Sequence, residues 1–224
     1  MKPTIPFRAA LFDMDGTLVD NSDIHVQAFR FFCDRYGVTD WESRLSNAFG
    51  MGSDDIMRML LPEVVIRNKG LKALGDEKEQ IYREIYAPTI QPITGLRALL
   101  EQLHQAGIRC AVGSSGCRDN VNFVLSKCKI EAFFDVQISG DMVARCKPDP
   151  EIYITAAKEL GIKIEECIIF EDARAGFEAA RRAGAGLVVG IATTLTKAQI
   201  LADNLADIVV EDFTEIDLSR VLHQ

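Results

Sequence analysis

The chain has 224 residues, of which 48% are hydrophobic, which suffices for one large domain or for a core with a smaller insertion. Its net charge of −8 argues against a nucleic-acid partner, and its apolar runs are too short for a signal peptide or for the roughly 20 residues of a membrane span. Six cysteines without a CxxC pair predict reduced thiols in a cytoplasmic protein, without a disulfide framework or a zinc site.

Short apolar runs predict the strands of one sheet. They cover residues 7–12, 108–113, 135–139, 167–170, 187–190 and 208–210. Helical patterns lie between the later runs, over residues 95–107, 120–128, 150–161 and 173–184. This alternation predicts an α/β fold in which helices cover both faces of a parallel sheet, with ligands outside the carboxyl ends of its strands.

The segment after the first strand departs from this alternation. Residues 20–92 contain no clear strand pattern, and helical patterns occupy residues 22–37, 53–61 and 75–86. We therefore expect an α/β core domain of residues 1–19 and 93–224, with an inserted all-helical domain of residues 20–92.

Two aspartates follow the first strand, in 11-LFDMDGT-17. Residues two apart on a strand share a face, so Asp13 and Asp15 project together if the extended backbone continues to residue 15. Two neighbouring carboxylates repel, and a shared proton or a hard cation relieves that repulsion. The alternative is a solvated aspartate in an Asp-Gly turn.

Three further strand ends carry polar groups. The loop 113-GSSGC-117 offers a hydroxyl and backbone N–H groups to an anion, although most such loops are only turns. Lys147 precedes a proline in extended or turn backbone, where a surface lysine is the alternative. Glu171 and Asp172 directly follow the fourth run, and a helix N-cap is the alternative for Asp172. Together these groups suit a divalent metal, a phosphate and a nucleophile.

The four motifs, in this order, resemble those of the haloacid dehalogenase superfamily. The chain is most similar to the phosphatases and phosphomutases with a helical cap after the first strand, in the β-phosphoglucomutase-like branch. The resemblance extends over about residues 7–212. It implies a Rossmann-like core domain, a mobile cap formed by the helical insertion, Mg²⁺ as cofactor and a small phosphorylated metabolite as substrate.

The resemblance also implies a role for each motif residue. Asp13 is the expected nucleophile, which forms an aspartyl-phosphate, and Asp15 the general acid and base. Ser114 is expected to hold the phosphoryl oxygens, and Lys147 to offset the charge on Asp13 and on the phosphate.

The same resemblance implies a metal site and part of the phosphate site. Mg²⁺ would be held by Asp13, the backbone carbonyl of Asp15 and Asp172, with Glu171 nearby or acting through water. The N–H groups next to Ser114, at Ser115 and Gly116, would bind phosphoryl oxygens.

Three more residues are candidates for substrate binding. His25 matches a histidine that helps the acid/base aspartate in the β-phosphoglucomutase branch, although an isolated helical histidine is usually structural or solvated. Lys78 matches a cap lysine that faces the substrate, and its alternative is an i,i+4 partner on a solvated helix face. Arg118 stands one position after the lysine of the second-motif loop in that branch.

The resemblance leaves several functions to compare. Asp15 argues against a dehalogenase or a phosphonate hydrolase, which lack this acid. The cap of β-phosphoglucomutase carries Gly-x-Ser-Arg, whose arginine grips the distal phosphate, but here 50-GMGSD-54 places Ser53 at that position.

We therefore expect a Mg²⁺-dependent phosphatase of a small phosphorylated metabolite, such as a sugar phosphate. The alternatives are a β-phosphoglucomutase, which interconverts glucose 1-phosphate and glucose 6-phosphate, and a non-catalytic protein that binds phosphorylated metabolites. We expect a monomer or a weak dimer.

Overall fold

The computed structural model describes residues 7–45 and 53–222. The chain divides into two compact units. The core unit comprises Met1–Asp20 and Ile90–Gln224, and the helical unit comprises Asn21–Thr89. Among the described residues, no helix is both long enough and apolar enough to cross a bilayer.

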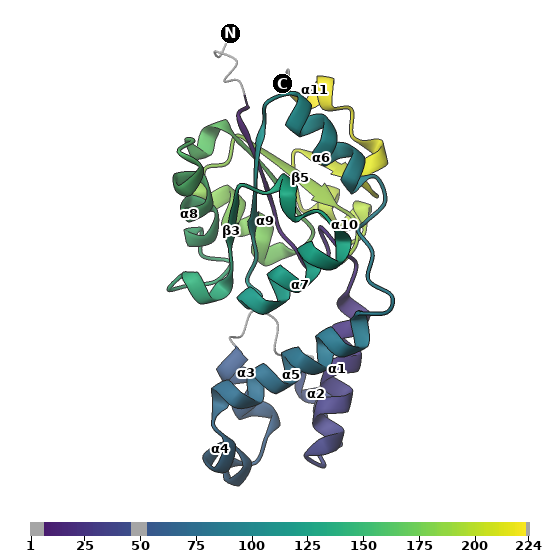
Figure 1. Ribbon diagram of the computed structural model, residues 1–224, viewed down its shortest axis with the longest axis vertical. Coiled ribbons are helices and arrows are strands. Elements are labelled where there is room, and N and C mark those ends of the chain that lie inside the picture. Colours follow the sequence, from purple (N-terminus) through teal and green to yellow (C-terminus); the bar gives the residue numbers. More distant parts are fainter. Residues whose placement is uncertain (1–6, 46–52, 223–224) are drawn as a thin grey trace. The chain divides into compact units, whose positions relative to one another are not determined.

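A parallel sheet of six strands forms the centre of the core unit, in the order β3-β2-β1-β4-β5-β6 (Figure 1). The six predicted runs form the strands β1 (Ala9–Phe12), β2 (Arg109–Gly113), β3 (Val136–Ile138), β4 (Cys167–Glu171), β5 (Leu187–Ile191) and β6 (Ile208–Val210). This sheet confirms the predicted Rossmann-like α/β core.

The register of the central strands brings the candidate residues to one level. β1 lies between β2 and β4, with Phe12 opposite both Val112 and Phe170. The residues after Phe12 and Phe170, Asp13 and Glu171, therefore follow at the same edge of the sheet. The strand order also reverses here, because the chain runs from β1 to β3 on one side and from β4 to β6 on the other. In open α/β sheets, ligands bind outside the carboxyl ends of strands at such a reversal.

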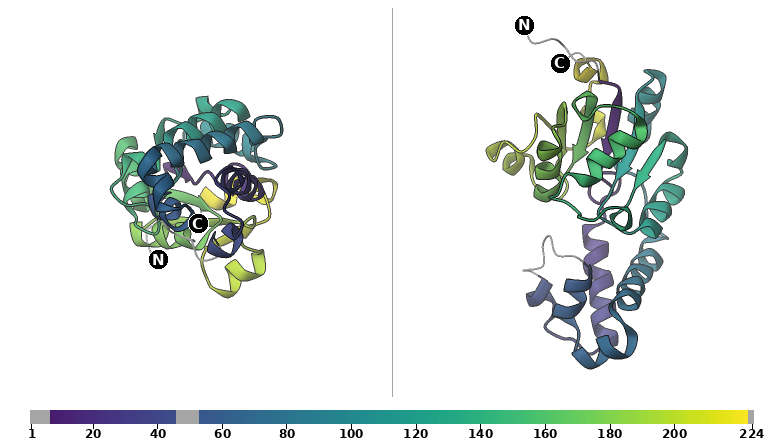
Figure 2. Two further views of the ribbon diagram at one scale, coloured as in Figure 1. Left: turned by 90° about the horizontal axis from the view of Figure 1, so that it is seen from below. Right: turned by 90° about the vertical axis from the view of Figure 1, so that its left-hand side faces the viewer.

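Helices cover both faces of the sheet, as the two orientations in Figures 1 and 2 show. Leu11 and Ile169 are buried on the face that packs against α8, α9 and α10. Phe12 and Phe170 come next in their strands and so face the opposite side of the sheet, where their rings stack with centroids 4.4 Å apart. Helices α6 and α7 cover that side (Figures 1 and 2). The helices of the core unit are α6 (Leu96–Gln105), α7 (Arg118–Cys128), α8 (Glu151–Leu160), α9 (Arg174–Ala183), α10 (Lys197–Ala202) and α11 (Leu218–Leu222). The described residues of the core unit also form the 3-10 turns η1 (Glu131–Phe133), η2 (Gly140–Met142), η3 (Ile164–Glu166) and η4 (Phe213–Glu215).

The described part of the helical unit contains helices and no strand. Its helices are α1 (Ser22–Arg35), α2 (Trp41–Leu45), α3 (Ser53–Leu60), α4 (Glu63–Lys69) and α5 (Leu71–Tyr86). α1 and α5 pack side by side (Figure 2) and bury Phe32, Leu74 and Ile81. The three predicted patterns correspond to α1, α3 and α5, whereas α2 and α4 have 5 and 7 residues and are too short to give a recognisable period.

Candidate active site

The chain turns sharply just after the first strand. β1 ends at Phe12, and the buried Asp13 still donates its N–H to the carbonyl of Phe170 at 3.0 Å. The carbonyl of Met14 then accepts the N–H of Leu18 at 2.8 Å, and Gly16 takes a left-handed conformation at φ 80°. The extended backbone that would place Asp13 and Asp15 on one face therefore ends before residue 15, because this turn replaces it.

Asp15 nevertheless remains near the second-motif loop. It forms an isolated parallel bridge with Val19. A Cβ atom added to Gly116 would lie 3.5 Å from the Asp15 Oδ2 atom. The carboxylate of Asp15 and the backbone of the predicted phosphate loop are thus neighbours.

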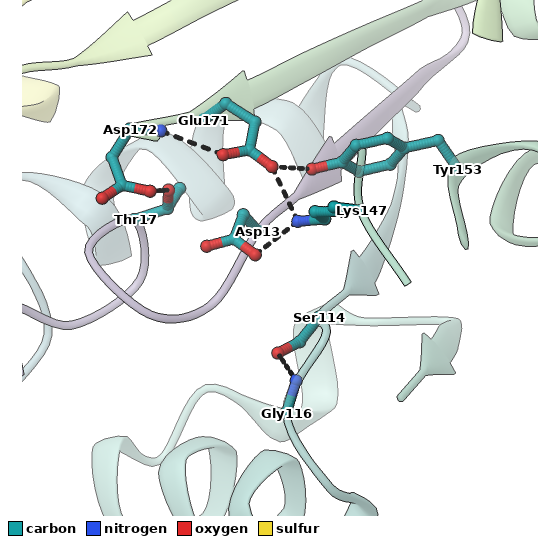
Figure 3. A network of polar contacts seen from close by, with 8 residues as sticks. All are labelled: Asp13, Thr17, Ser114, Gly116, Lys147, Tyr153, Glu171 and Asp172. Atoms are coloured by element: carbon teal, nitrogen blue, oxygen red, sulfur yellow. Dashed lines mark hydrogen bonds and ion pairs between the residues drawn. The ribbon is translucent and has the colours of Figure 1, made fainter. Parts of the chain in front are cut away.

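Lys147 links the first and fourth motifs (Figure 3). Its ammonium donates to Asp13 Oδ1 at 2.5 Å and to Glu171 Oε1 at 2.6 Å, and its side chain is only 6% exposed. Burial alone would lower the pKa of Lys147, but the carboxylates of Asp13 and Glu171 keep that pKa above its ordinary value. The alternative of a surface lysine is therefore wrong.

Glu171 accepts hydrogen bonds at both of its oxygens. Tyr153 donates its hydroxyl to Oε1 at 2.5 Å, and the N–H of Asp172 donates to Oε2 at 3.1 Å (Figure 3). A Cβ atom on Gly176, in the first turn of α9, would lie only 1.9 Å from the Glu171 carboxylate. Glycine at position 176 therefore makes the room that this carboxylate occupies.

The contact with Tyr153 was not predicted from the sequence. Tyr153 lies on the buried face of α8, where an aromatic residue indicates only core packing. Burial raises the pKa of its hydroxyl well above the ordinary value, and Glu171 raises it further. Tyr153 therefore remains a hydrogen-bond donor at neutral pH.

Asp172 is held by hydroxyl groups from two loops. Thr17 Oγ1 donates to its Oδ1 at 3.5 Å, and Thr193 Oγ1 lies 3.4 Å from its Oδ2 while donating to the carbonyl of Gly16 at 2.5 Å. A Cβ atom on Gly16 would lie 2.0 Å from Asp172 Oδ2, so this close approach requires glycine. The N-cap of α9 is Ala173, and the N-cap alternative for Asp172 is therefore wrong.

Three carboxylates form a buried cluster that fits a divalent cation. One oxygen from each of Asp13, Glu171 and Asp172 lies within 4.8 Å of the others. Burial raises the pKa of Asp13 well above its ordinary value; Lys147 lowers it in part, and Glu171 and Asp172 raise it further. Burial and the charge of Glu171 also raise the pKa of Asp172 to about 7. Such an acid cluster favours a hard cation, because carboxylate oxygens are the ligands of Mg²⁺ and a cation relieves their repulsion.

The second-motif loop lies beside this cluster in Figure 3. The N–H of Ser114 donates to the carbonyl of Ile138, and its buried hydroxyl oxygen accepts the N–H of Gly116 at 3.0 Å. The proton of this hydroxyl is therefore available for an anion. Ser115 is exposed. Arg118 begins α7, where its N–H donates to Asp141 Oδ2 at 2.7 Å.

His25 and Lys78 contact each other within the helical unit. The Lys78 ammonium lies 3.4 Å from His25 Nδ1 and 2.5 Å from Glu79 Oε1, and the His25 ring stacks on Tyr82 with centroids 4.1 Å apart. Lys78 is only 4% exposed, so the solvated-face alternative for this lysine is wrong. Their role towards a substrate stays a prediction. In the cap motif, Gly50–Gly52 lie outside the described residues, and Ser53 and Asp54 are exposed at the start of α3.

Comparisons with known proteins show the family of the chain. A family model described as "Haloacid dehalogenase-like hydrolase" matches residues 10–190. A validoxylamine A 7'-phosphate phosphatase from Streptomyces hygroscopicus subsp. limoneus is 33% identical over 217 residues, covering 94% of this chain and 96% of that protein. A phosphorylated carbohydrates phosphatase from Thermotoga maritima is 28% identical over 198 residues, covering 87% and 90%.

Solved structures share the fold. A haloacid dehalogenase hydrolase of family IA, variant 3, from Entamoeba histolytica superposes with a TM-score of 0.83 at 26% identity, covering 96% of this chain and 98% of that one. A β-phosphoglucomutase from Clostridium difficile superposes with a TM-score of 0.76 at 22% identity, covering 96% and 95%, which is a likeness of fold alone.

Proposed function

Since this chain belongs to the haloacid dehalogenase-like hydrolase family, we propose that it is a Mg²⁺-dependent phosphatase of a small phosphorylated metabolite, such as a sugar phosphate. The observation that carries the proposal is the Lys147 ammonium bonded to both Asp13 and Glu171, inside a cluster of buried carboxylates. An anionic nucleophile meets an anionic phosphate only where positive charge offsets their repulsion. The names of the phosphatase relatives support the substrate class.

The proposed nucleophile is the carboxylate of Asp13. Its Oδ1 atom accepts the hydrogen bond from Lys147, and the other oxygen attacks phosphorus. A bond forms between this oxygen and phosphorus while the bond from phosphorus to the leaving oxygen breaks, which gives an aspartyl-phosphate. Ser114 and the N–H groups beside it bind the phosphoryl oxygens.

Asp15 is the proposed general acid and base. It first gives a proton to the leaving oxygen, so that the alcohol departs neutral. It then takes a proton from a water molecule that attacks the phosphorus of the aspartyl-phosphate, which releases phosphate and restores Asp13. Its place beside Gly116 in the second-motif loop, while Asp13 is bonded to Lys147, supports the separate roles of the two aspartates.

The residues that would hold Mg²⁺ are Asp13, Asp172 and the backbone carbonyl of Asp15. When bound, the ion supplies positive charge beside the phosphoryl oxygens. Asp172 is oriented for this role by the hydroxyl of Thr17. Glu171, whose two oxygens accept hydrogen bonds from protein groups, is placed to act through Lys147 or a water molecule.

We propose that the helical unit acts as the cap that selects the substrate. His25 and Lys78 are its proposed binding residues, because they supply a ring nitrogen and a buried ammonium in one cluster. Ser115, Gly116 and Arg118 are proposed to contact the substrate from the core unit. We also propose that the protein lies in the cytoplasm, a reducing compartment, because free thiols persist there. Its buried free thiols are Cys33, Cys110, Cys128 and Cys167.

A β-phosphoglucomutase is the second candidate, favoured by the resemblance of the sequence motifs to that branch of the superfamily. A mutase must hold a second phosphate, for which a bidentate arginine is the best ligand. The chain has Ser53 and then Asp54 at that place. An acid beside a phosphate dianion weakens binding, so we favour the phosphatase.

The test is a screen of phosphate release across a panel of phosphorylated metabolites, with Mg²⁺ and with excess EDTA after metal-free preparation. We expect phosphate release from at least one sugar phosphate with Mg²⁺ and none with EDTA. A parallel reaction contains β-glucose 1-phosphate and a trace of glucose 1,6-bisphosphate. If glucose 6-phosphate accumulates there much faster than phosphate, the chain is a mutase. Full turnover in EDTA would contradict the metal requirement.

A further inference from the structure

Tyr153 occupies the space between the second and fourth motifs. It is a fully buried residue of α8. Its ring packs on the bare backbone of Gly113, where an added Cβ atom would lie 3.2 Å from Cε1. The ring therefore packs on the residue before Ser114, and its hydroxyl donates to the carboxylate of Glu171 (Figure 3). Its hydroxyl proton is already donated to Glu171, so Tyr153 is placed to act through that carboxylate.

We propose that Tyr153 is a positioning residue, whose hydroxyl holds Glu171 so that the Lys147 ammonium stays shared between Glu171 and Asp13. This inference rests on the proposed phosphatase function. Tyr153 meets the other two groups at once: its hydroxyl donates to Glu171 Oε1 at 2.5 Å, and the Lys147 ammonium lies 4.7 Å from the centroid of its ring. A cation over an aromatic face is attracted by the ring quadrupole, so the ring also helps to place the ammonium.

The balance between the two carboxylates depends on the tyrosine hydroxyl. Glu171 Oε1 receives two donors, Tyr153 and Lys147, while its Oε2 receives the N–H of Asp172. The carboxylate also lies against the bare backbone of Gly176, where an added Cβ atom would be 1.9 Å from it. Without the hydroxyl, Lys147 becomes the main donor to Oε1, and the buried carboxylate attracts the ammonium more strongly. The ammonium then moves away from Asp13, which loses part of the charge that offsets the incoming phosphate.

The first experiment compares Tyr153→Phe with the wild type on the best substrate of the panel. The phenyl ring keeps the packing on Gly113 and removes only the hydroxyl. We expect kcat to fall about ten- to a hundredfold, as for a lost hydrogen bond to a charged group, and KM to change less than about threefold. Tyr36→Phe is the matched control. In the helical unit, the Tyr36 hydroxyl donates to Glu77, and Glu77 also accepts a hydrogen bond from Lys69. Its kcat is expected to stay within about twofold of the wild type.

A double-mutant cycle separates positioning from a general structural effect. In a Glu171→Gln background the acceptor has lost its charge, so Tyr153→Phe is expected to lower kcat by less than about threefold. If the two substitutions lower kcat multiplicatively, Tyr153 does not act through Glu171 and the proposal is wrong. A Tyr153→Phe protein with kcat within about twofold of the wild type would also overturn it.

A binding measurement tests the inference without turnover. Beryllium fluoride with Mg²⁺ mimics a phosphoryl group on a carboxylate, and its binding raises the melting temperature. We expect a smaller rise for Tyr153→Phe than for wild type and Tyr36→Phe, because Asp13 has lost part of its cation. An equal rise in all three proteins contradicts the proposal. Should no phosphate ester be hydrolysed by the wild type, the phosphatase function fails, while this measurement still decides the role of Tyr153.

Discussion

Replacing Lys147 with methionine tests the electrostatic basis of the site. The side chain keeps its length and loses its charge, which leaves Asp13 and Glu171 buried without the ammonium that both of them contact. Removing one partner of a buried ion pair costs about 3–5 kcal/mol. The cost of neutralising one carboxylate gives a similar free energy. Protonating, at pH 7, a carboxyl group whose ordinary pKa is near 4 costs about 4 kcal/mol.

We therefore expect the metal-free variant to lose about 4 kcal/mol of folding free energy at pH 7. For a chain of this size that lowers the melting temperature by about 8–16 °C. The sign of the pH dependence follows from the carboxyl groups. Burial already raises the pKa of Asp13 well above its ordinary value. In the wild type the Lys147 ammonium lowers that pKa in part, and the variant lacks this effect. From about pH 4 to 7 the folded variant therefore binds more protons than the unfolded chain, so its folding free energy decreases as pH rises. The difference in folding free energy between variant and wild type therefore becomes smaller towards pH 4.

The assays are urea unfolding and thermal melting, each followed by circular dichroism, in EDTA and at several pH values. Lys69→Met is the control: Lys69 also bonds a tyrosine hydroxyl and a glutamate, but its side chain is 45% exposed. Exposed ion pairs contribute little, so this control should unfold near the wild-type midpoint. A metal-free Lys147→Met protein that melts within about 2 °C of the wild type at pH 7 would refute the reasoning.

Three further substitutions test single roles in the site. Asp13→Asn should abolish turnover and leave the fold intact, with equal or higher stability because a buried carboxylate is neutralised; a variant with a tenth of the wild-type rate would exclude Asp13 as nucleophile. Asp15→Ala should reduce turnover of a sugar phosphate far more than that of a nitrophenyl phosphate, whose leaving group needs no proton; equal losses would contradict the acid role. Gly176→Ala should lower kcat at least about tenfold in steady-state kinetics, because the added methyl group overlaps the Glu171 carboxylate. An unchanged kcat would show that this carboxylate can move without loss of activity.

Local patterns in the sequence were sufficient for the fold and for the candidate site. Each strand is a short apolar run. Asp13 and Ser114 directly follow β1 and β2, and Glu171 is the last residue of β4. Parallel strands bring their carboxyl ends to one edge, so residues far apart in the chain are predicted to meet without knowledge of the packing. The motif order then indicated the family, which the family model confirms over residues 10–190.

The local sequence patterns did not predict the path of the backbone after β1 or the burial of Lys78. An extended path to Asp15 was one possibility, but the turn at Gly16, closed by the bond from Leu18 to the Met14 carbonyl, ends it earlier. Lys78 was weighed as a solvated residue, because the spacing of charges on a helix does not reveal which helix will cover it. Packing of α5 against α1 buries it beside His25.

The sequence by itself determined the strands, the order of the motifs and the residue types at the strand ends, because these depend on local periodicity and on a parallel sheet. Only the tertiary structure decided which neutral side chains complete the site. Tyr153 donates to Glu171 because α8 packs across β1 and β2, and Thr193 reaches Gly16 and Asp172 from the loop after β5. In the sequence, one is an aromatic residue on a buried helix face and the other a threonine in a turn. A hydrogen bond between side chains depends on the angle and depth of packing, which no periodicity of residues records.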